Sequence, residues 1–317
     1  MKKSVPFARR FKQVVSGAMI ALAASVATVP AVQAEEKDSF KLAWSIYAGW
    51  IPWKYIDESG LMKKWADKYG ISVEIVQIND YIESINQYSA GQFDGVVATS
   101  MDALSIPAAG GVDTTALIVG DYSNGNDGIV MKDSSDVADM KGQQVNLVEL
   151  SVSHYLLARA LDSVGLSEAD VQVVNTSDAD MVAIYGTDDV TSVATWNPLL
   201  SEISQQPSST VVFNSAQIPG EIIDLLVINT ETLNAHPELG KALTGAWYEI
   251  MATMSSDSEQ GVAARSYMAE ASGTDLAGYE AQLAATKMFY TPAAALELTN
   301  SAQLKQTMQY VAEFSFD

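Results

Sequence analysis

Residues 88–102 read Tyr88-Ser-Ala-Gly91-Gln-Phe-Asp94-Gly95-Val-Val-Ala98-Thr99-Ser100-Met101-Asp102, and a later stretch repeats their pattern. The second stretch reads Ile184-Tyr-Gly186-Thr-Asp-Asp189-Val-Thr-Ser-Val-Ala194-Thr195-Trp196-Asn197-Pro198, aligned with a one-residue insertion. Each copy ends a helical pattern at a glycine, turns at an acidic residue and continues as a short apolar strand that ends in Val-Ala-Thr. Chance convergence on a common helix-turn-strand pattern is the alternative. The repeat predicts two similar α/β lobes, each with a polar loop at the carboxyl end of a strand, where open α/β sheets bind ligands.

Strand and helix signals alternate along most of the chain, which favours a mostly parallel sheet. We expect strands at 40–46, 72–78, 95–98, 115–119, 144–148, 171–174, 210–213 and 224–229. We expect helices at 51–69, 81–90, 102–109, 153–164 and 178–185, and an almost wholly helical segment from 237 to 314. Residues 121–128 read as a turn-rich loop.

This order predicts one lobe built from both ends of the chain and a second lobe inserted between two crossings. The expected boundaries give 35–130 plus 227–317 for the first lobe and 131–226 for the second. Two crossings with a cleft between the lobes form a hinge.

Residues 1–34 carry the pattern of a cleavable bacterial secretory signal. An apolar run at 14–29 follows a basic start and precedes the cleavage site Val32-Gln33-Ala34. An uncleaved anchor helix is the alternative. There is no cysteine for a lipoprotein anchor, and no later stretch reaches the ~20 apolar residues of a transmembrane helix. We therefore expect a soluble, periplasmic protein.

The charge balance limits the classes of partner that the protein is expected to bind. Five of the 18 basic residues and none of the 39 acidic ones lie in the first 34 residues, so the remainder carries 13 basic and 39 acidic residues. Such a chain repels nucleic acid and anionic membranes. Solubility or a saline habitat would also explain the acidity. The negative field favours a cationic ligand over an anionic one.

The arginine count tests the charge of the ligand independently. Only Arg159 and Arg265 follow the signal. Recognition of sulfonate, sulfate or carboxylate usually employs arginine forks or clustered helix amino ends. A small anion is therefore disfavoured, although helix amino ends alone can bind one.

Three stretches resemble the periplasmic substrate-binding proteins of ABC importers of the nitrate/sulfonate/taurine type. They are Lys41-Leu-Ala-Trp44-Ser-Ile-Tyr47-Ala-Gly49-Trp50, Ala90-Gly91-Gln-Phe-Asp94-Gly95 and Ala194-Thr195-Trp196-Asn197-Pro198. The resemblance implies an α/β fold, a two-lobe clamshell of the periplasmic-binding-protein type (type II-like) with two hinge crossings. It also implies a monomer that needs no cofactor and delivers a small solute to an ABC permease in the inner membrane.

Two further stretches, at 84–95 and 118–129, resemble the subgroup encoded beside urea-carboxylase-type enzymes. That subgroup implies a nitrogen-rich solute of the urea, guanidine or amide class, with guanidine favoured. A planar cation such as guanidinium needs carboxylates for bidentate hydrogen bonds and an aromatic ring for its face.

Aromatic, acidic and amide side chains at the expected loop ends supply this chemistry. The ligand contacts we expect are Trp44, Tyr47, Trp50, Asp80, Asp102, Asp121, Asp127, Glu149, Trp196 and Asn197. Each has a structural alternative. Trp44 and Trp50 fit a core, Asp102 fits a helix cap, and Asp121 and Asp127 fit Asx turns.

Other classes of protein have weaker support. A binding protein for a sulfonate, nitrate or other small anion is the first alternative, and a biosynthetic enzyme on the same fold is the second. The chain has no Gly-x-Ser-x-Gly, P-loop or His-Glu-x-x-His motif. With no cysteine and only His154 and His236, which are not spaced as ligands, a metal site is not expected either.

Overall fold

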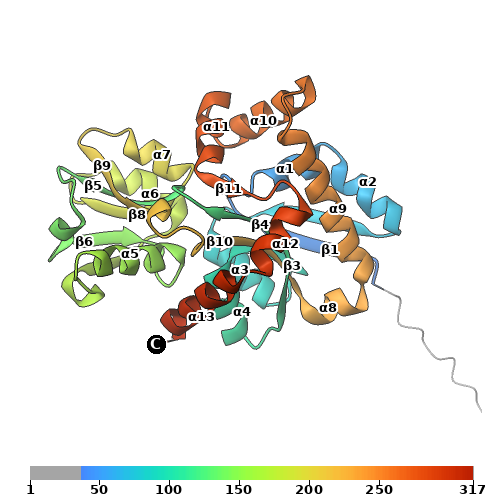
Figure 1. Ribbon diagram of the computed structural model, residues 1–317, viewed down its shortest axis with the longest axis horizontal. Helices are drawn as coiled ribbons and strands as arrows, with labels where there is room; N and C mark the ends of the chain where they lie inside the picture. Colours follow the sequence, from blue (N-terminus) through green and yellow to red (C-terminus); the bar gives the residue numbers. More distant parts are fainter. Residues whose placement is uncertain (1–36, 317) are drawn as a thin grey trace, which may run out of the picture. The chain divides into compact units, whose positions relative to one another are not determined.

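The computed structural model of the protein describes residues 37–316, so the expected secretory signal at 1–34 lies outside the described residues. These residues form two mixed sheets with helices packed around them (Figure 1). Within this part of the chain, no helix is both long and apolar enough to cross a membrane.

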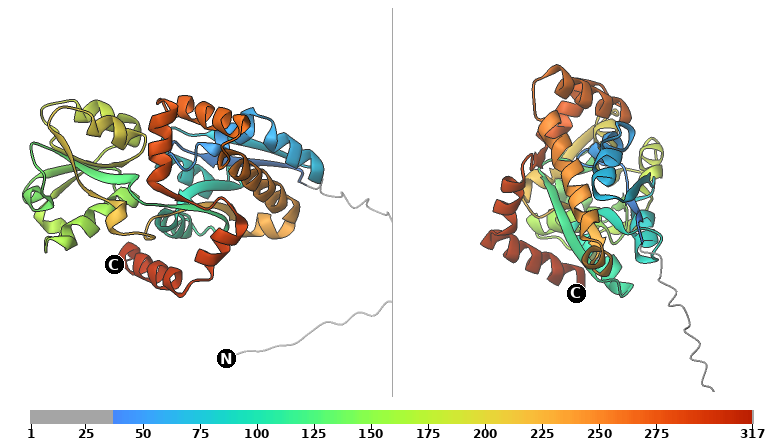
Figure 2. Two further views of the ribbon diagram at one scale, coloured as in Figure 1. Left: turned by 45° about the horizontal axis from the view of Figure 1, so that its top comes forward. Right: turned by 90° about the vertical axis from the view of Figure 1, so that its right-hand side faces the viewer.

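The first sheet has six strands in the order β11-β4-β10-β3-β1-β2. Its strands are β1 Ser39–Trp44, β2 Ser72–Gln77, β3 Gly95–Thr99, β4 Thr114–Ser123, β10 Ile223–Asn229 and β11 Thr286–Met288. The helices that belong with it come from both ends of the chain. They are α1 Pro52–Glu58, α2 Leu61–Tyr69, α3 Tyr81–Ser89, α4 Ser100–Ala109, α8 Thr230–Ala235, α9 Pro237–Met254, α10 Glu259–Ala271, α11 Leu276–Ala284, α12 Pro292–Thr299 and α13 Ala302–Phe316. The last of these, α13, lies beside α4 (Figure 2).

The second sheet has five strands in the order β7-β6-β8-β5-β9. Its strands are β5 Asp127–Lys132, β6 Gln144–Leu147, β7 Gln172–Asn175, β8 Ser192–Trp196 and β9 Ser209–Asn214. Its helices are α5 Val152–Ser163, α6 Asp178–Tyr185 and α7 Leu199–Ser204, with short 3-10 turns at Val137–Met140, Glu168–Asp170 and Ser215–Gln217.

The two sheets have the same strand topology over five strands. The series β2-β1-β3-β10-β4 and β7-β6-β8-β5-β9 have the same parallel and antiparallel neighbours in the same places. Strands β3 and β8, which carry the repeated phrase, are third in both series. All five residues of each are buried, as expected for apolar strands covered on both faces. The repeated phrase therefore marks equivalent strands.

The chain crosses between the sheets twice. It leaves the first sheet after β4, at 124–126, and returns between β9 and β10, at 215–222. The two crossings are joined, because the hydroxyls of Ser123 and Ser215 lie 2.7 Å apart and Gly125 donates its N–H to Ser215. The boundaries expected at 130/131 and 226/227 fall inside β5 and β10, a few residues beyond these crossings.

Several expected elements differ from those observed. The helix expected at 51–69 is divided at Gly60, whose φ of 77° favours glycine. The loop expected at 121–128 shrinks to 124–126, because β4 and β5 extend into it through ladder hydrogen bonds. The helix expected from Asp102 begins at Ser100, with Thr99 at its N-cap position, and β11 interrupts the helical C-terminal segment.

Replacing Gly95 with alanine should lower the free energy of unfolding by about 2 kcal/mol, because overpacking a filled core costs about 1–3 kcal/mol. A Cβ at Gly95 would lie 2.3 Å from Ile228 Cδ1 and 2.8 Å from the Val227 carbonyl oxygen. Urea unfolding followed by circular dichroism measures the effect. The matched control is Gly186→Ala at an exposed helix end with φ of −65°, which should shift stability by less than about 0.5 kcal/mol. Equal losses in both variants would contradict the packing argument.

Candidate functional site

A small cavity lies between elements of the two lobes, and its walls are aromatic and acidic. It measures about 10 Å³, roughly the space that one water molecule needs. It is lined by Tyr47, Trp50, Tyr81, Thr99, Asp127, Val152, Trp196 and Asp224. The first lobe supplies most of these residues, and the second contributes the starts of β5 and α5 and the end of β8. The walls thus close around a space of about one water molecule.

Four rings form a continuous aromatic wall. The ring centroids of Tyr47 and Trp50 lie 5.2 Å apart, those of Trp50 and Tyr81 lie 5.5 Å apart, and those of Tyr81 and Trp196 also lie 5.5 Å apart. Trp196 Nε1 donates to the carbonyl of Ile46 at 3.1 Å, which fixes its ring across the two lobes. The rings meet edge-on or tilted rather than stacked.

Three carboxyl groups gather at one side of the cavity. Asp121 on β4 pairs directly with Asp224 on the neighbouring β10, and Asp127 begins β5. All three are at most 2% exposed. Trp50 Nε1 donates to Asp224 Oδ1 at 3.1 Å, and a Cβ at Gly49 would lie only 2.7 Å from Asp121 Oδ2. Glycine at position 49 therefore lets the 47–50 turn approach the carboxyl cluster.

No basic side chain in the described part of the chain compensates this cluster. Burial raises the pKa of Asp121 and that of Asp127 to about 7. Burial, together with the negative charges of Asp121 and Asp127, raises the pKa of Asp224 well above its usual value. The same causes raise the pKa of the Tyr47 hydroxyl, so this hydroxyl is neutral. Near neutral pH the cluster must hold protons or a cation.

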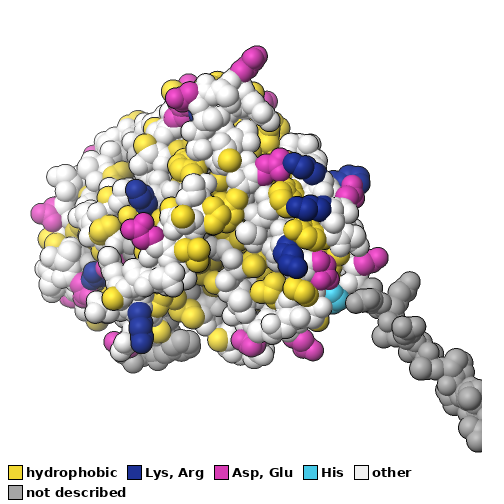
Figure 3. Space-filling view, turned by 45° about the vertical axis from the view of Figure 1, so that its right-hand side comes forward, with side chains coloured by type: hydrophobic (Ala, Val, Ile, Leu, Met, Phe, Trp, Pro, Cys, Tyr) yellow, Lys and Arg dark blue, Asp and Glu magenta, His cyan; other side chains and the backbone are white. Residues whose placement is uncertain are grey.

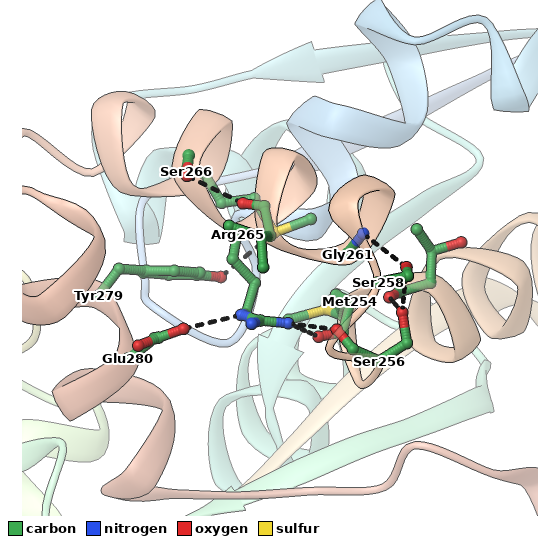
Figure 4. A network of polar contacts seen from close by, with 11 residues as sticks. Met254, Ser256, Ser258, Gly261, Arg265, Ser266, Tyr279 and Glu280 are labelled. Atoms are coloured by element: carbon green, nitrogen blue, oxygen red, sulfur yellow. Dashed lines mark hydrogen bonds and ion pairs between the residues drawn. The ribbon is translucent and has the colours of Figure 1, made fainter.

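The arginines that follow the expected signal are occupied elsewhere. Arg265 donates to the carbonyl oxygens of Met254 and Ser256 at 2.7 and 2.8 Å and to Glu280 at 3.0 Å (Figure 4). Arg159 makes two hydrogen bonds to Glu221, of 2.8 and 3.1 Å. Basic side chains on the face shown in Figure 3 lie at the surface. Lys64 pairs with Glu249 at 2.7 Å. Neither arginine lines the small cavity.

Asp102 lies behind the aromatic wall. Its Oδ2 accepts hydrogen bonds from Tyr81 Oη at 2.7 Å, Thr99 Oγ1 at 2.9 Å and the Val152 N–H at 3.3 Å. Burial raises its pKa to about 6 despite these bonds. Because Val152 begins α5, Asp102 ties the first lobe to the second.

Besides Asp102 and Asp121, four of the expected contact residues do not line the cavity. Trp44 ends β1 inside the hydrophobic core. Asp80 caps α3 by accepting from the Glu83 N–H at 2.9 Å, and it also accepts from Ser177 Oγ at 3.0 Å. Glu149 is exposed.

The fourth, Asn197, supports the site from outside. Its Nδ2 donates to Asn126 Oδ1 at 2.6 Å, and its carbonyl accepts from the Ala48 N–H at 3.2 Å. These bonds hold together the crossing at 124–126, the Trp196 loop and the 47–50 turn. Of the expected set, Tyr47, Trp50, Asp127 and Trp196 line the cavity, and Asp102 and Asp121 contact its lining residues.

Four lining residues were not in the expected set: Tyr81, Thr99, Val152 and Asp224. The sequence around Asp224 contained a pattern from which its role could have been predicted. Asp224 is a carboxylate between Ile223 and Leu225 in an apolar strand, and a buried charge in such a run calls for a partner. Nothing in the sequence showed that Asp121 is that neighbour.

A larger cavity of about 1030 Å³ lies between α3, α4, α5 and α13. Asp102, Leu150 and His154 are among its lining residues. We place the candidate site in the smaller cavity, because the uncompensated carboxyl cluster is there. His154 pairs with Glu168 at 3.3 Å and His236 packs edge-on against Phe40, so neither histidine lines the small cavity. Among the described residues, no group of side chains has an arrangement that could hold a metal ion.

Solved structures of binding proteins share this fold. The alkanesulfonate-binding protein SsuA from Xanthomonas axonopodis pv. citri, bound to MOPS, aligns with a TM-score of 0.72 at 18% identity over 89% of this chain and 93% of that chain. The aliphatic sulphonate-binding protein SsuA from Escherichia coli aligns with a TM-score of 0.66 at 19% identity over 87% and 92%. The predicted α/β two-lobe clamshell of periplasmic binding proteins is thereby confirmed.

Sequence comparison agrees with the fold. The taurine-binding periplasmic protein of Escherichia coli (strain K12) is 25% identical over 117 residues, and the match spans 36% of each chain, about a third of that relative's length. These relatives are binding proteins and not enzymes. Residues 59–259 match the family described as NMT1/THI5 like. The chain belongs to the NMT1/THI5-like family, and the relatives named here are periplasmic binding proteins for taurine and sulfonates.

Proposed function

We propose that the protein is the solute-binding component of an ABC importer and captures a small planar cation, guanidinium within the guanidine and urea class. The secretory signal at 1–34 brings it to the periplasm, where it acts as a monomer without a cofactor and delivers its solute to a permease in the inner membrane. The observation that supports this ligand class is the burial of Asp121, Asp127 and Asp224 beside aromatic rings without a basic partner.

The charge of the site supports a cation. Burying a carboxylate away from water is costly unless a cation or hydrogen-bond donors compensate it. Both oxygens of Asp121 and one oxygen each of Asp127 and Asp224 have no donor among the described residues. A guanidinium ion supplies pairs of N–H donors and a positive charge, and both suit carboxylates.

The size and walls of the site support a small, flat ligand. A cavity of about 10 Å³ must widen even for guanidinium, and far more for a sulfonate with a long organic body. The rings of Trp50, Tyr81 and Trp196 offer faces at which a desolvated cation gains about 2 kcal/mol. The resemblance to the urea-carboxylase-associated subgroup points to the same class.

A sulfonate, nitrate or another small anion is the second candidate, and the taurine- and sulfonate-binding relatives favour it. The buried carboxyl cluster opposes it, because an anion in this cavity would face Asp127 and Asp224 with no arginine in reach. Urea and small amides need no charge compensation, so the carboxylates support them less than they support guanidinium.

Isothermal titration calorimetry against guanidinium chloride, urea, taurine and nitrate should show the tightest binding for guanidinium. Urea should bind about 10- to 100-fold more weakly, because hydrogen bonds to charged groups are worth about 1.5–3 kcal/mol. Taurine and nitrate should give no binding heat. Binding of either anion without binding of guanidinium would refute the cation assignment.

Replacing Trp196 with leucine should lower guanidinium affinity about 30-fold, the equivalent of about 2 kcal/mol of lost cation–π energy. The matched control, Trp196→Phe, keeps a ring and should retain most of the affinity. Calorimetry on both variants measures the difference, and circular dichroism checks that both are folded. Equal affinities for the two variants would remove this ring face from the site.

Replacing Asp224 with asparagine should weaken guanidinium binding about 10- to 100-fold, because a charge-assisted hydrogen bond is lost. The ligand-free variant should be at least as stable as the wild type at pH 8, since a like charge is removed from the cluster. The control Asp180→Asn changes an exposed carboxylate on α6 and should leave affinity unchanged. An unaltered affinity in Asp224→Asn would exclude this carboxyl group from the site.

A further inference from the structure

We propose that the bound cation takes the place of a proton held between Asp121 and Asp224, so that each capture event releases a proton to solvent. The inference rests on the proposed function, because it requires a cationic ligand in this cavity. It adds a property of the site, namely that ligand capture is a cation-for-proton exchange.

The geometry of the pair requires a proton in the unliganded site. Asp121 and Asp224 are direct cross-strand neighbours on β4 and β10. Two ionised carboxylates can only accept hydrogen bonds, so a hydrogen bond between them exists only when one holds a proton. Both carboxyl groups are buried, and a proton on one of them supplies the donor that the oxygens of the other lack among the described residues. The Trp50 indole donates to just one oxygen of the pair and leaves the other three without a donor among the described residues.

The neighbouring titratable groups also favour a proton there. Asp127 faces the pair from β5, and its negative charge raises the pKa of Asp224. The negative charge of Asp102 in turn raises the pKa of Asp127. The hydroxyls of Tyr47, Tyr279 and Tyr290 face it from the 47–50 turn, α11 and the segment after β11. These hydroxyls are neutral. The charge of Arg265 lowers the pKa of Tyr290, but Arg265 itself is bonded to Glu280 and to two carbonyl oxygens.

The exchange balances without any other reactant. The ligand enters as a cation and stays one, the O–H bond of the protonated carboxyl group breaks, and the proton leaves to water or buffer. The charge inside the cavity is therefore nearly constant, which avoids the cost of adding or removing a buried charge. A neutral isostere such as urea cannot drive this exchange. Its binding should favour the protonated pair and weaken as pH rises, opposite to guanidinium.

Calorimetry in buffers of different ionisation enthalpy tests the proposal. At pH 6, the dependence of the observed heat of guanidinium binding on buffer ionisation enthalpy should show release of about one proton. The release should fall as pH rises through the pKa of the pair. Below the pKa of the pair, affinity should rise about tenfold for each pH unit. Burial raises the pKa of Asp121 to about 7, so the change falls in an accessible range.

The variant Asp121→Asn separates the two proposals. It should bind guanidinium more weakly but release almost no proton at pH 6, whereas the control Asp180→Asn should match the wild type in both respects. Binding by the wild type with no proton release and no pH dependence would overturn the exchange and leave the cation site standing. No binding of guanidinium between pH 6 and pH 9 would overturn the proposed function itself.

Thermal unfolding gives a second readout. A carboxyl group whose folded-state pKa is raised binds more protons folded than unfolded, so its stabilising effect is lost as pH rises from about 4 through about 7. The ligand-free wild type should therefore lose more stability between pH 5 and pH 8 than Asp121→Asn does. Saturating guanidinium should remove most of that difference. An identical decline in both proteins would contradict a proton held by this pair.

Discussion

The burial of three carboxyl groups without a basic partner is the constraint on which this structure depends. Asp121, Asp127 and Asp224 sit where β4 ends, β5 begins and β10 begins, which are the points where the chain crosses between the sheets. The hinge and the candidate site are therefore built from the same few residues. In the proposed function, a ligand that compensates this charge would also act on the segments that join the lobes, which would couple binding to lobe closure.

Contacts across the lobes hold the aromatic wall in place. The Trp196 indole reaches the Ile46 carbonyl, and the Asn197 carbonyl accepts from the Ala48 N–H. Asp102 adds a bond to the first turn of α5. Each bond joins a strand-end loop of one lobe to the other lobe, so the four rings meet only when the lobes are together. The cavity is a property of the closed arrangement rather than of either lobe.

The fold is shared with sulfonate-binding proteins, but a fold does not determine a ligand. In this chain the two arginines of the described residues are both occupied, one by Glu221 and the other by Glu280 and helix-end carbonyls. The groups that reach the cavity are carboxyls and rings. The same scaffold thus presents a negative, aromatic site, and charge complementarity separates this chain's proposed ligand from those of its relatives.

The sequence by itself determined the alternation of elements, the equivalence of β3 and β8, and the placement of Tyr47, Trp50, Asp127 and Trp196 at strand ends, because these depend on local patterns. The tertiary structure alone decided which strand-end side chains converge. Asp80 became a helix cap and Glu149 faces solvent, since position at a strand end does not set the direction of a side chain. Asp224 joined Asp121 through strand pairing between segments about a hundred residues apart, and no local pattern encodes that register.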